Sequence, residues 1–205
     1  MIPLLTIMIP TTVDRKPLFE KLILELWRQV FEYGMIHEVD IIFEEDNKEM
    51  SVGKKRQKLL ERANGIFVVG FDSDDWPAET YILDIILALR ENPFTDHVGF
   101  IESCDIDGQK STSIFSIKHK SWDDYEIGYD QVRCANPKSV IRRTKAIQVG
   151  YEDLRFGEDR IFSEKVTPIL EAEIFIEKPL YYYRHNSKET NDRYGFNRDK
   201  EANIN

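Results

Sequence analysis

Residues 66–77 read IFVVGFDSDDWP, a run of apolar strand-forming residues that ends in three aspartates, Asp72, Asp74 and Asp75. Carboxylates this close repel one another and raise one another's pKa unless a positive charge lies among them. The stretch therefore predicts a buried strand that leads directly into a charged site.

The segments on either side alternate between two periodicities. Apolar runs at 4–9, 39–43 and 66–71 are typical of buried parallel strands, and Pro10 is expected to end the first. Helical spacing of apolar residues occurs over 15–33, 52–63 and 78–90, with Pro77 suited to a helix start. Alternating strands and helices predict one α/β domain with a mainly parallel sheet.

The second half is less regular. It predicts a hairpin over 98–118 that turns at Asp107-Gly108, followed by a long loop over 119–135. A short strand and helix precede Gly150, a further helix follows Gly157, and two final strands cover 174–176 and 180–183. Residues 186–205 are polar, and we expect them to form a tail.

Composition narrows the class of protein. The 205 residues carry a net charge of -9, which makes non-specific affinity for DNA or anionic membranes unfavourable. No apolar run approaches the roughly 18 residues of a membrane span. Two cysteines without metal-ligand spacing fit a reducing compartment, and the apolar N-terminus resembles a first strand more than a signal peptide. We therefore expect a cytoplasmic protein without a membrane span.

Polar residues follow three of the predicted strands: Thr11 and Thr12, then Glu44, Glu45 and Asp46, then the aspartates. Ligands of open α/β sheets bind beyond such strand ends. Two carboxylates spaced Asp-x-Asp can hold Mg²⁺ or Mn²⁺, whose shell is completed by waters and substrate phosphates. The alternative is that Asp74 or Asp75 caps a helix that begins near Pro77.

Three stretches in this order resemble the signature of family 2-type glycosyltransferases with the GT-A fold: IMIPTTVDR, SVGKKRQKLLERANGIFVVGFDSDDW and FGEDRIF. The matching residues are Pro10 and Thr11; Gly53, Arg56, Ala63 and Gly65; Asp72, Asp74 and Asp75; and Glu158 and Asp159. The resemblance spans residues 4–185. It implies one GT-A catalytic domain over 1–185, with a nucleotide-sugar-binding half (1–103), an acceptor-side half (104–185) and a polar tail (186–205).

The resemblance further implies a small, soluble enzyme that transfers one hexose or pentose, with inversion, from a nucleotide-sugar to an acceptor hydroxyl. A UDP-sugar is the favoured donor. Mn²⁺ or Mg²⁺, held mainly by Asp74 and assisted by Asp72, would bridge the diphosphate. Asp159, with Glu158 beside it, would be the general base. Because the Gln-x-x-Arg-Trp signature of processive relatives is absent from the sequence, single transfer is expected.

Other donor contacts follow from the same resemblance. Arg56 and Ser73 would lie at the diphosphate, whereas Lys54 and Lys55 are expected on a solvated helix face. The family's acidic pair and Gly-Ser after the second strand appear only as FEEDNKEMS, so Glu45 or Asp46 would contact the nucleobase or ribose.

Three aromatic or imidazole side chains have two interpretations each. His185 is either a metal ligand or a solvated histidine. Trp76 and Trp122 are either sugar-stacking residues or packing residues.

Two other functions remain open. A GT-A-like nucleotidyltransferase would need a glycine-rich loop after the first strand, and TTVDRK has no glycine. A non-catalytic nucleotide-sugar-binding protein would keep the site without turnover. The expected acceptor is a saccharide or lipid-linked saccharide. Basic stretches at 118–120 and 142–145 leave room for a modified DNA base, although a solvated surface is the favoured interpretation of both.

Overall fold

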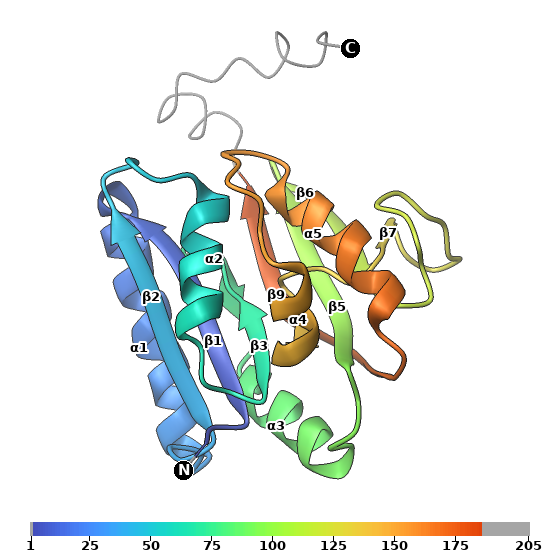
Figure 1. The fold of residues 1–205 in the computed structure, drawn as a ribbon, viewed down its shortest axis with the longest axis horizontal. Coiled ribbons are helices and arrows are strands. Elements are labelled where there is room, and N and C mark those ends of the chain that lie inside the picture. The colour runs from blue at the N-terminus through green and yellow to red at the C-terminus, as the bar shows by residue number, and fades with distance from the viewer. Residues whose placement is uncertain (1, 186–205) are drawn as a thin grey trace, which may run out of the picture.

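The computed structural model describes residues 2–185 (Figure 1). The elements of the first half are β1 (Leu5–Thr12), η1 (Val13–Arg15), α1 (Lys16–Glu32), β2 (Val39–Asp46), α2 (Val52–Arg62), β3 (Phe67–Gly70), β4 (Trp76–Pro77) and α3 (Tyr81–Glu91). Those of the second half are β5 (His97–Ile106), β6 (Gln109–Phe115), β7 (Gln131–Arg133), β8 (Val140–Arg142), α4 (Arg143–Val149), α5 (Glu158–Val166), η2 (Thr167–Ile169) and β9 (Glu173–His185). Among these residues no helix is long and apolar enough to cross a membrane.

The strands of residues 2–185 form one mixed sheet with the order β2-β1-β3-β8-β5-β6-β7, in which β9 pairs with β5 and β4. Strand β1 is parallel to β2 and β3, and β5 is parallel to β9 along its whole length. The short pairings of β8 and β4 and the β5–β6 hairpin are antiparallel. Most paired residues are thus in parallel strands, and the expected α/β fold is confirmed.

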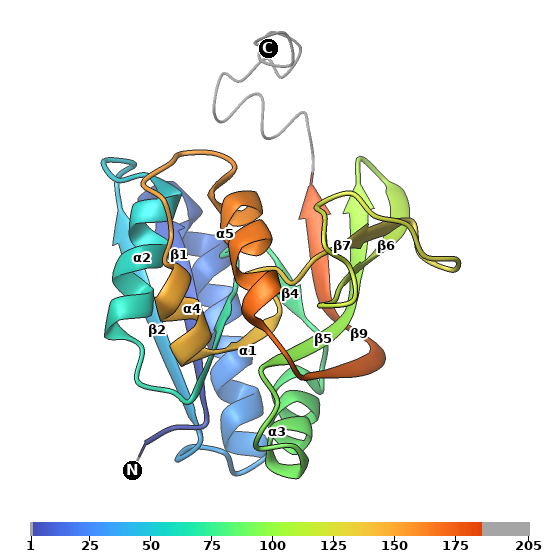
Figure 2. The same cartoon turned by 45° about the vertical axis from the view of Figure 1, so that its right-hand side comes forward.

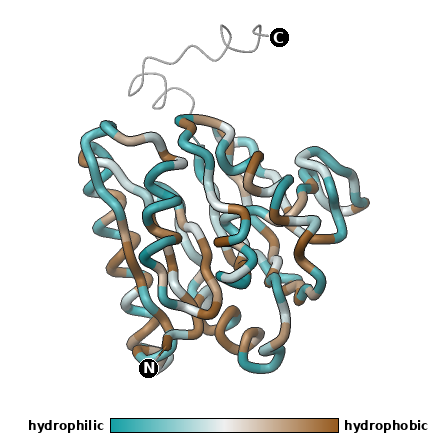
Figure 3. The backbone as a smooth tube through the Cα atoms, in the orientation of Figure 1, coloured by the Kyte–Doolittle hydropathy of each residue, from teal (hydrophilic) through white to brown (hydrophobic). Residues whose placement is uncertain are grey.

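Helices cover both faces of the sheet (Figures 1 and 2). Helices α1 and α3 pack on one face, and α2, α4 and α5 pack together on the other. Side chains alternate along β1, so Ile7 and Ile9 join the α1 core while Met8 joins the α2 core. Figure 3 shows largely hydrophobic α3 at the bottom and the hydrophilic β2–α2 connection at the upper left, where β1 and β2 end.

Pro10 does not end the first strand, contrary to the expectation. Strand β1 continues to Thr12, and Pro10 pairs with Glu44 of β2. Strand β3 pairs with β1 only as far as Met8. No residue of β3 therefore lies opposite Pro10 to accept a hydrogen bond from the backbone N–H that proline lacks. Strand β2 also continues to Asp46, which places the predicted post-strand acidic residues inside the strand.

Pro77 does not start a helix either. Trp76 and Pro77 form β4, which pairs with Tyr182 and Tyr181 of β9, and α3 begins only at Tyr81. The three aspartates are therefore not the cap of α3. The two predicted final strands are one strand, β9, whose pairing with β5 shifts register near Phe100–Glu102. The predicted loop over 119–135 contains the short strand β7, and the predicted tail, 186–205, lies outside the described residues.

Candidate functional site

The turn after β3 gives two of its aspartates separate cationic partners. Arg56 Nη2, from α2, donates a hydrogen bond to Asp72 Oδ1 at 2.7 Å. Arg15 Nη1, from η1, donates to Asp74 Oδ1 at 3.1 Å. Burial acts to raise the pKa of Asp72, but Arg56 and other nearby cations outweigh it and lower that pKa. Burial raises the pKa of Asp74 in spite of Arg15, so a further cation would stabilise the charged form of Asp74.

The third aspartate, Asp75, is more deeply buried than Asp72 and Asp74. The hydroxyl of Tyr181 donates to Asp75 Oδ2 at 2.5 Å, and Lys138 Nζ lies 3.5 Å from the same oxygen. Burial raises the pKa of Asp75 to about 8. This aspartate belongs to the support of the site, in contact with β9 and the β7–β8 connection.

Lys138 is the residue that the sequence analysis missed. Its Nζ lies 3.0 Å from Glu102 Oε1 and 3.9 Å from Asp72 Oδ2, as well as beside Asp75. Burial acts to lower the pKa of Lys138, but Glu102, Asp75 and Asp72 raise it well above its usual value. A lysine in the irregular stretch ANPKS carries no periodic or motif signal, so the sequence offered no way to place it.

The predicted pair Glu158-Asp159 opens α5, and its two carboxylates lie in different surroundings. Gly157 precedes them with φ 80°, a left-handed conformation that favours glycine. Glu158 is buried and accepts a hydrogen bond from Arg56 Nε at 3.2 Å, and burial raises its pKa. Asp159 is half-buried, and its Oδ1 accepts a hydrogen bond from the backbone N–H of Arg160 at 2.8 Å.

Arg56 therefore joins α5 to the aspartate turn, because its guanidinium binds Glu158 on one side and Asp72 on the other. These two carboxylates belong to different halves of the chain. The structure thus brings the second and third motifs together.

The ends of β1 and β2 are joined by Lys55. Its Nζ donates to the backbone oxygen of Thr11 at 2.7 Å and forms an ion pair with Asp46. Asp46 also accepts from the backbone N–H of Met50 at 2.6 Å. Lys55 is buried, so its expected place on a solvated helix face was wrong, whereas Lys54 is exposed as expected. Glu45 is exposed beside Thr11, its register partner.

Several buried polar atoms at these strand ends have no hydrogen-bond partner among residues 2–185. They include Thr11 Oγ1, Ser73 Oγ and Arg56 Nη1. Buried polar atoms in folded proteins are nearly always paired, so a cluster of exceptions needs an explanation. A polar ligand in this crevice would supply one.

The carboxylates do not form a complete metal site by themselves. Within residues 2–185, no three His, Cys, Asp or Glu side chains converge as such a site. Mg²⁺ is often bound by one or two carboxylates together with substrate phosphates, and Asp72 and Asp74 fit that arrangement. The ring of His185 stacks on Tyr183 at the end of β9, with the centroids 6.3 Å apart, and its role as a ligand stays a prediction.

Solved structures with a similar fold identify the fold class. S. aureus TarS residues 1–349 in complex with UDP-GlcNAc matches with a TM-score of 0.61 at 16% identity, over 88% of this chain and 58% of that one. The mannosyltransferase PcManGT from Pyrobaculum calidifontis, in complex with GDP-Man and Mn²⁺, matches with a TM-score of 0.51 at 13% identity, over 89% and 57%.

The chain therefore spans less than two thirds of either structure. No family model and no curated protein sequence matches it. The fold is that of the GT-A glycosyltransferases, as the motifs predicted.

Proposed function

We propose that this protein is a metal-dependent, inverting glycosyltransferase that moves one sugar from a nucleotide-sugar to an acceptor hydroxyl. The observation that carries the proposal is the arrangement of Asp72 and Asp74 beside unpaired buried polar atoms, at the carboxyl ends of parallel strands in a GT-A fold. Two TarS structures contain UDP-GlcNAc and UDP, and the mannosyltransferase contains GDP-Man and Mn²⁺. These neighbours support a nucleotide-sugar donor and a divalent ion.

The donor would occupy the crevice at the ends of β1, β2 and β3. The hydroxyls of Thr11 and Ser73 and Arg56 Nη1 would bind phosphate or ribose oxygens, which would pair the buried atoms that lack partners. Pro10, which precedes Thr11 in β1, would also lie beside the donor. Asp46 and Glu45 would face the ribose or nucleobase, and we favour a UDP-sugar.

Asp74, assisted by Asp72, would hold Mn²⁺ or Mg²⁺. When bound, the ion offsets the negative charge that the diphosphate gains as the sugar leaves. Arg15 would then release Asp74 and become available to a phosphate oxygen. His185, at the end of β9, would be a further ligand of the ion.

Asp159 would act as the general base. Its carboxylate would take the proton of the acceptor hydroxyl while that oxygen forms a bond to the anomeric carbon. The bond from that carbon to the diphosphate breaks at the same time, and the nucleoside diphosphate leaves from the opposite face. One such displacement inverts the anomeric configuration. Glu158, bound to Arg56, would keep the start of α5 in place.

Calorimetric titration of UDP, GDP, CDP and their sugar conjugates, with and without Mn²⁺, tests the proposal. We expect one nucleotide to bind the wild type only with the ion, and Asp74→Ala to abolish this metal-dependent binding because the ion loses its main ligand. The control is Asp123→Ala, which removes an exposed aspartate of the 119–135 region and should leave binding unchanged. Binding that ignores both the ion and Asp74→Ala would contradict the proposal.

A further inference from the structure

A cavity of about 470 Å³ lies beside Asp74 and is lined by the first turns of α1 and by strands β4, β5, β6 and β9. Its lining includes Tyr183 and two exposed aromatic side chains, Trp76 and Tyr182. They are direct partners across the antiparallel β4–β9 pair, so both project from the same face of the sheet. Trp76 is 44% exposed and Tyr182 is 41% exposed, which makes them surface aromatics and not core residues.

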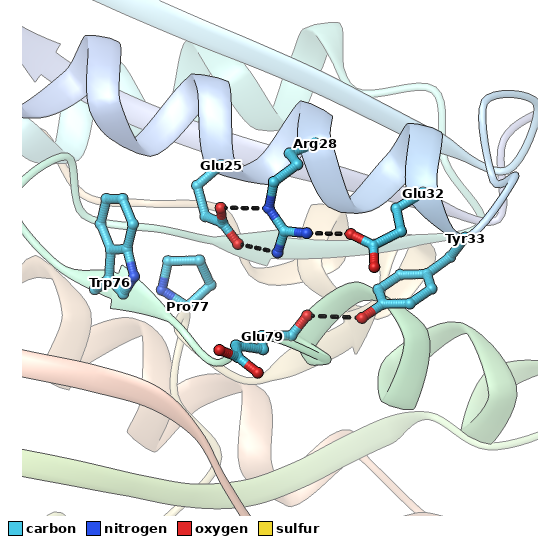
Figure 4. A pocket seen from close by; sticks show the side chains of 7 residues that line it. All are labelled: Glu25, Arg28, Glu32, Tyr33, Trp76, Pro77 and Glu79. Atoms are coloured by element: carbon cyan, nitrogen blue, oxygen red, sulfur yellow. Dashed lines mark hydrogen bonds and ion pairs between the residues drawn. The ribbon is translucent and has the colours of Figure 1, made fainter.

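A second cavity of about 400 Å³ shares Trp76 with the first. Figure 4 shows it, with Trp76 at one end, Tyr33 at the other, and Arg28 of α1 between Glu25 and Glu32. The residues of α1 that line the two cavities recur every three or four positions: Leu18, Lys21, Glu25, Arg28 and Glu32. They form one stripe of the helix, so the two cavities together make a groove along α1, which we call the α1 groove.

At 1.5 Å per helical residue, the stripe from Leu18 to Glu32 is about 21 Å long. A nucleotide-sugar donor carries a single transferable sugar, which is much shorter. A ligand that fills the α1 groove must be a chain of several units, one end of which lies beside Asp74.

We propose that the α1 groove binds the acceptor, an oligosaccharide without anionic groups, with one pyranose ring stacked on the indole of Trp76. This inference rests on the proposed transferase function. The apolar C–H face of a sugar ring matches the exposed face of an aromatic side chain, and the polar tips of Tyr33 and Tyr182 can bind its hydroxyls.

The charges of the second cavity disfavour anionic groups on the part of the acceptor that lies there, whereas the cavity beside Asp74 is lined by both cations and carboxylates. The cavity of Figure 4 is lined by Glu25, Glu32 and Glu79, and its lining among the described residues contains one cation, Arg28. Arg28 already donates to Glu25 at 2.7 Å and pairs with Glu32, so its guanidinium is engaged. A sulfated glycan or a nucleic acid would meet net negative charge here, whereas a neutral or amine-bearing saccharide would not.

The experiment measures binding of the fluorescently labelled full chain to an array of immobilised oligosaccharides, in the presence of Mn²⁺ and the nucleotide that binds best. The array carries neutral, amine-bearing and sulfated chains of several linkages. We expect signals on neutral or amine-bearing chains, a loss of roughly tenfold or more in Trp76→Ala, and partial recovery in Trp76→Phe, which keeps an aromatic face. The matched control is Phe94→Ala, because Phe94 is 89% exposed and lies outside the groove.

Four outcomes would overturn the inference: no binding by the wild type to any chain, unchanged binding by Trp76→Ala, a preference for sulfated chains, or a loss of affinity in Trp76→Ala for the UDP-sugar but not for UDP. The last outcome would assign the Trp76 ring to the donor sugar. Metal-dependent nucleotide binding is measured on the same variants. If the wild type binds the nucleotide with the metal but binds no oligosaccharide, the inference falls and the proposed function stands. If the wild type shows no metal-dependent nucleotide binding, the proposed function falls.

Discussion

Single buried charges hold the aspartate turn together, and Lys138 is the central one. Its side chain is 15% exposed, and its Nζ lies among carboxylates of Glu102, Asp75 and Asp72 and 4.2 Å from the ring centroid of Tyr183. Each of these carboxylates comes from the end of β3 or from β5, so one ammonium group fixes two strands relative to each other. The same ammonium offsets the repulsion that the motif alone would create.

Lys138→Met tests this role. We expect the variant to lower the free energy of unfolding by about 3–5 kcal/mol, because removal of Lys138 leaves the buried carboxyl groups of Glu102 and Asp75 without their cation. Urea denaturation at pH 7 measures the change. Lys54→Met, at an exposed position of α2, should change the same quantity by no more than about 0.5 kcal/mol. Equal stability of the two variants would show that the carboxylates do not depend on Lys138.

At the scale of elements, the start of α2 packs directly on the segment that leads into α5. The N–H of Gly53 donates to the backbone oxygen of Leu154 at 3.1 Å. A Cβ at Gly53 would lie 1.9 Å from the backbone oxygen of Glu152, which is far too close for any side chain. The motif glycine of α2 therefore serves close packing between two elements.

We predict that Gly53→Ala lowers the free energy of unfolding by about 1–3 kcal/mol, since the 152–154 backbone must move. Chemical denaturation measures this loss, with Lys54→Ala at the next, exposed position as the control. Calorimetry should also show weaker metal-dependent nucleotide binding, because α2 carries Arg56. An unchanged free energy of unfolding would show that the 152–154 backbone moves away from the new methyl group without loss of stability.

At the scale of the whole molecule, the two halves of the chain meet through the chain of contacts Glu158–Arg56–Asp72. Arg56 and Glu158 are 102 positions apart in sequence. In the proposed function, the first half binds the donor and the start of α5 supplies the base. A mutation at the start of α5 should therefore change the rate of sugar transfer without changing the affinity for the nucleotide.

Asp159→Asn should therefore leave nucleotide affinity unchanged while sugar transfer falls by about 10²–10⁴-fold, the usual range for loss of a general base. Transfer is measured with a labelled donor on an oligosaccharide that the wild type binds. Glu164→Gln, on the exposed side of the same helix, is the matched control and should transfer normally. Near-normal transfer by Asp159→Asn would assign the base to another group.

Much of the fold followed from local patterns. The three strand–helix units of the first half, the Asp107-Gly108 turn and the helix after Gly157 are all present, because apolar periodicity and turn chemistry act over a few residues. The errors share one cause, which is that the pairing of a strand with a distant part of the chain overrides the local sequence pattern. Strand β4 has two residues and exists only because β9 pairs with it, and Pro10 is tolerated in β1 only because β3 has already ended.

The sequence by itself determined the class of fold and the place of the candidate site, since both depend on residues adjacent along the chain. Asp72 and Asp74 follow their strand, and Glu158 and Asp159 open their helix, wherever the rest of the chain lies. Only the tertiary structure decided which cations balance the aspartates, that Lys55 is buried, and that Trp76 joins two cavities along α1. Burial, charge pairing and cavity shape depend on contacts between distant segments, and no local pattern encodes those contacts.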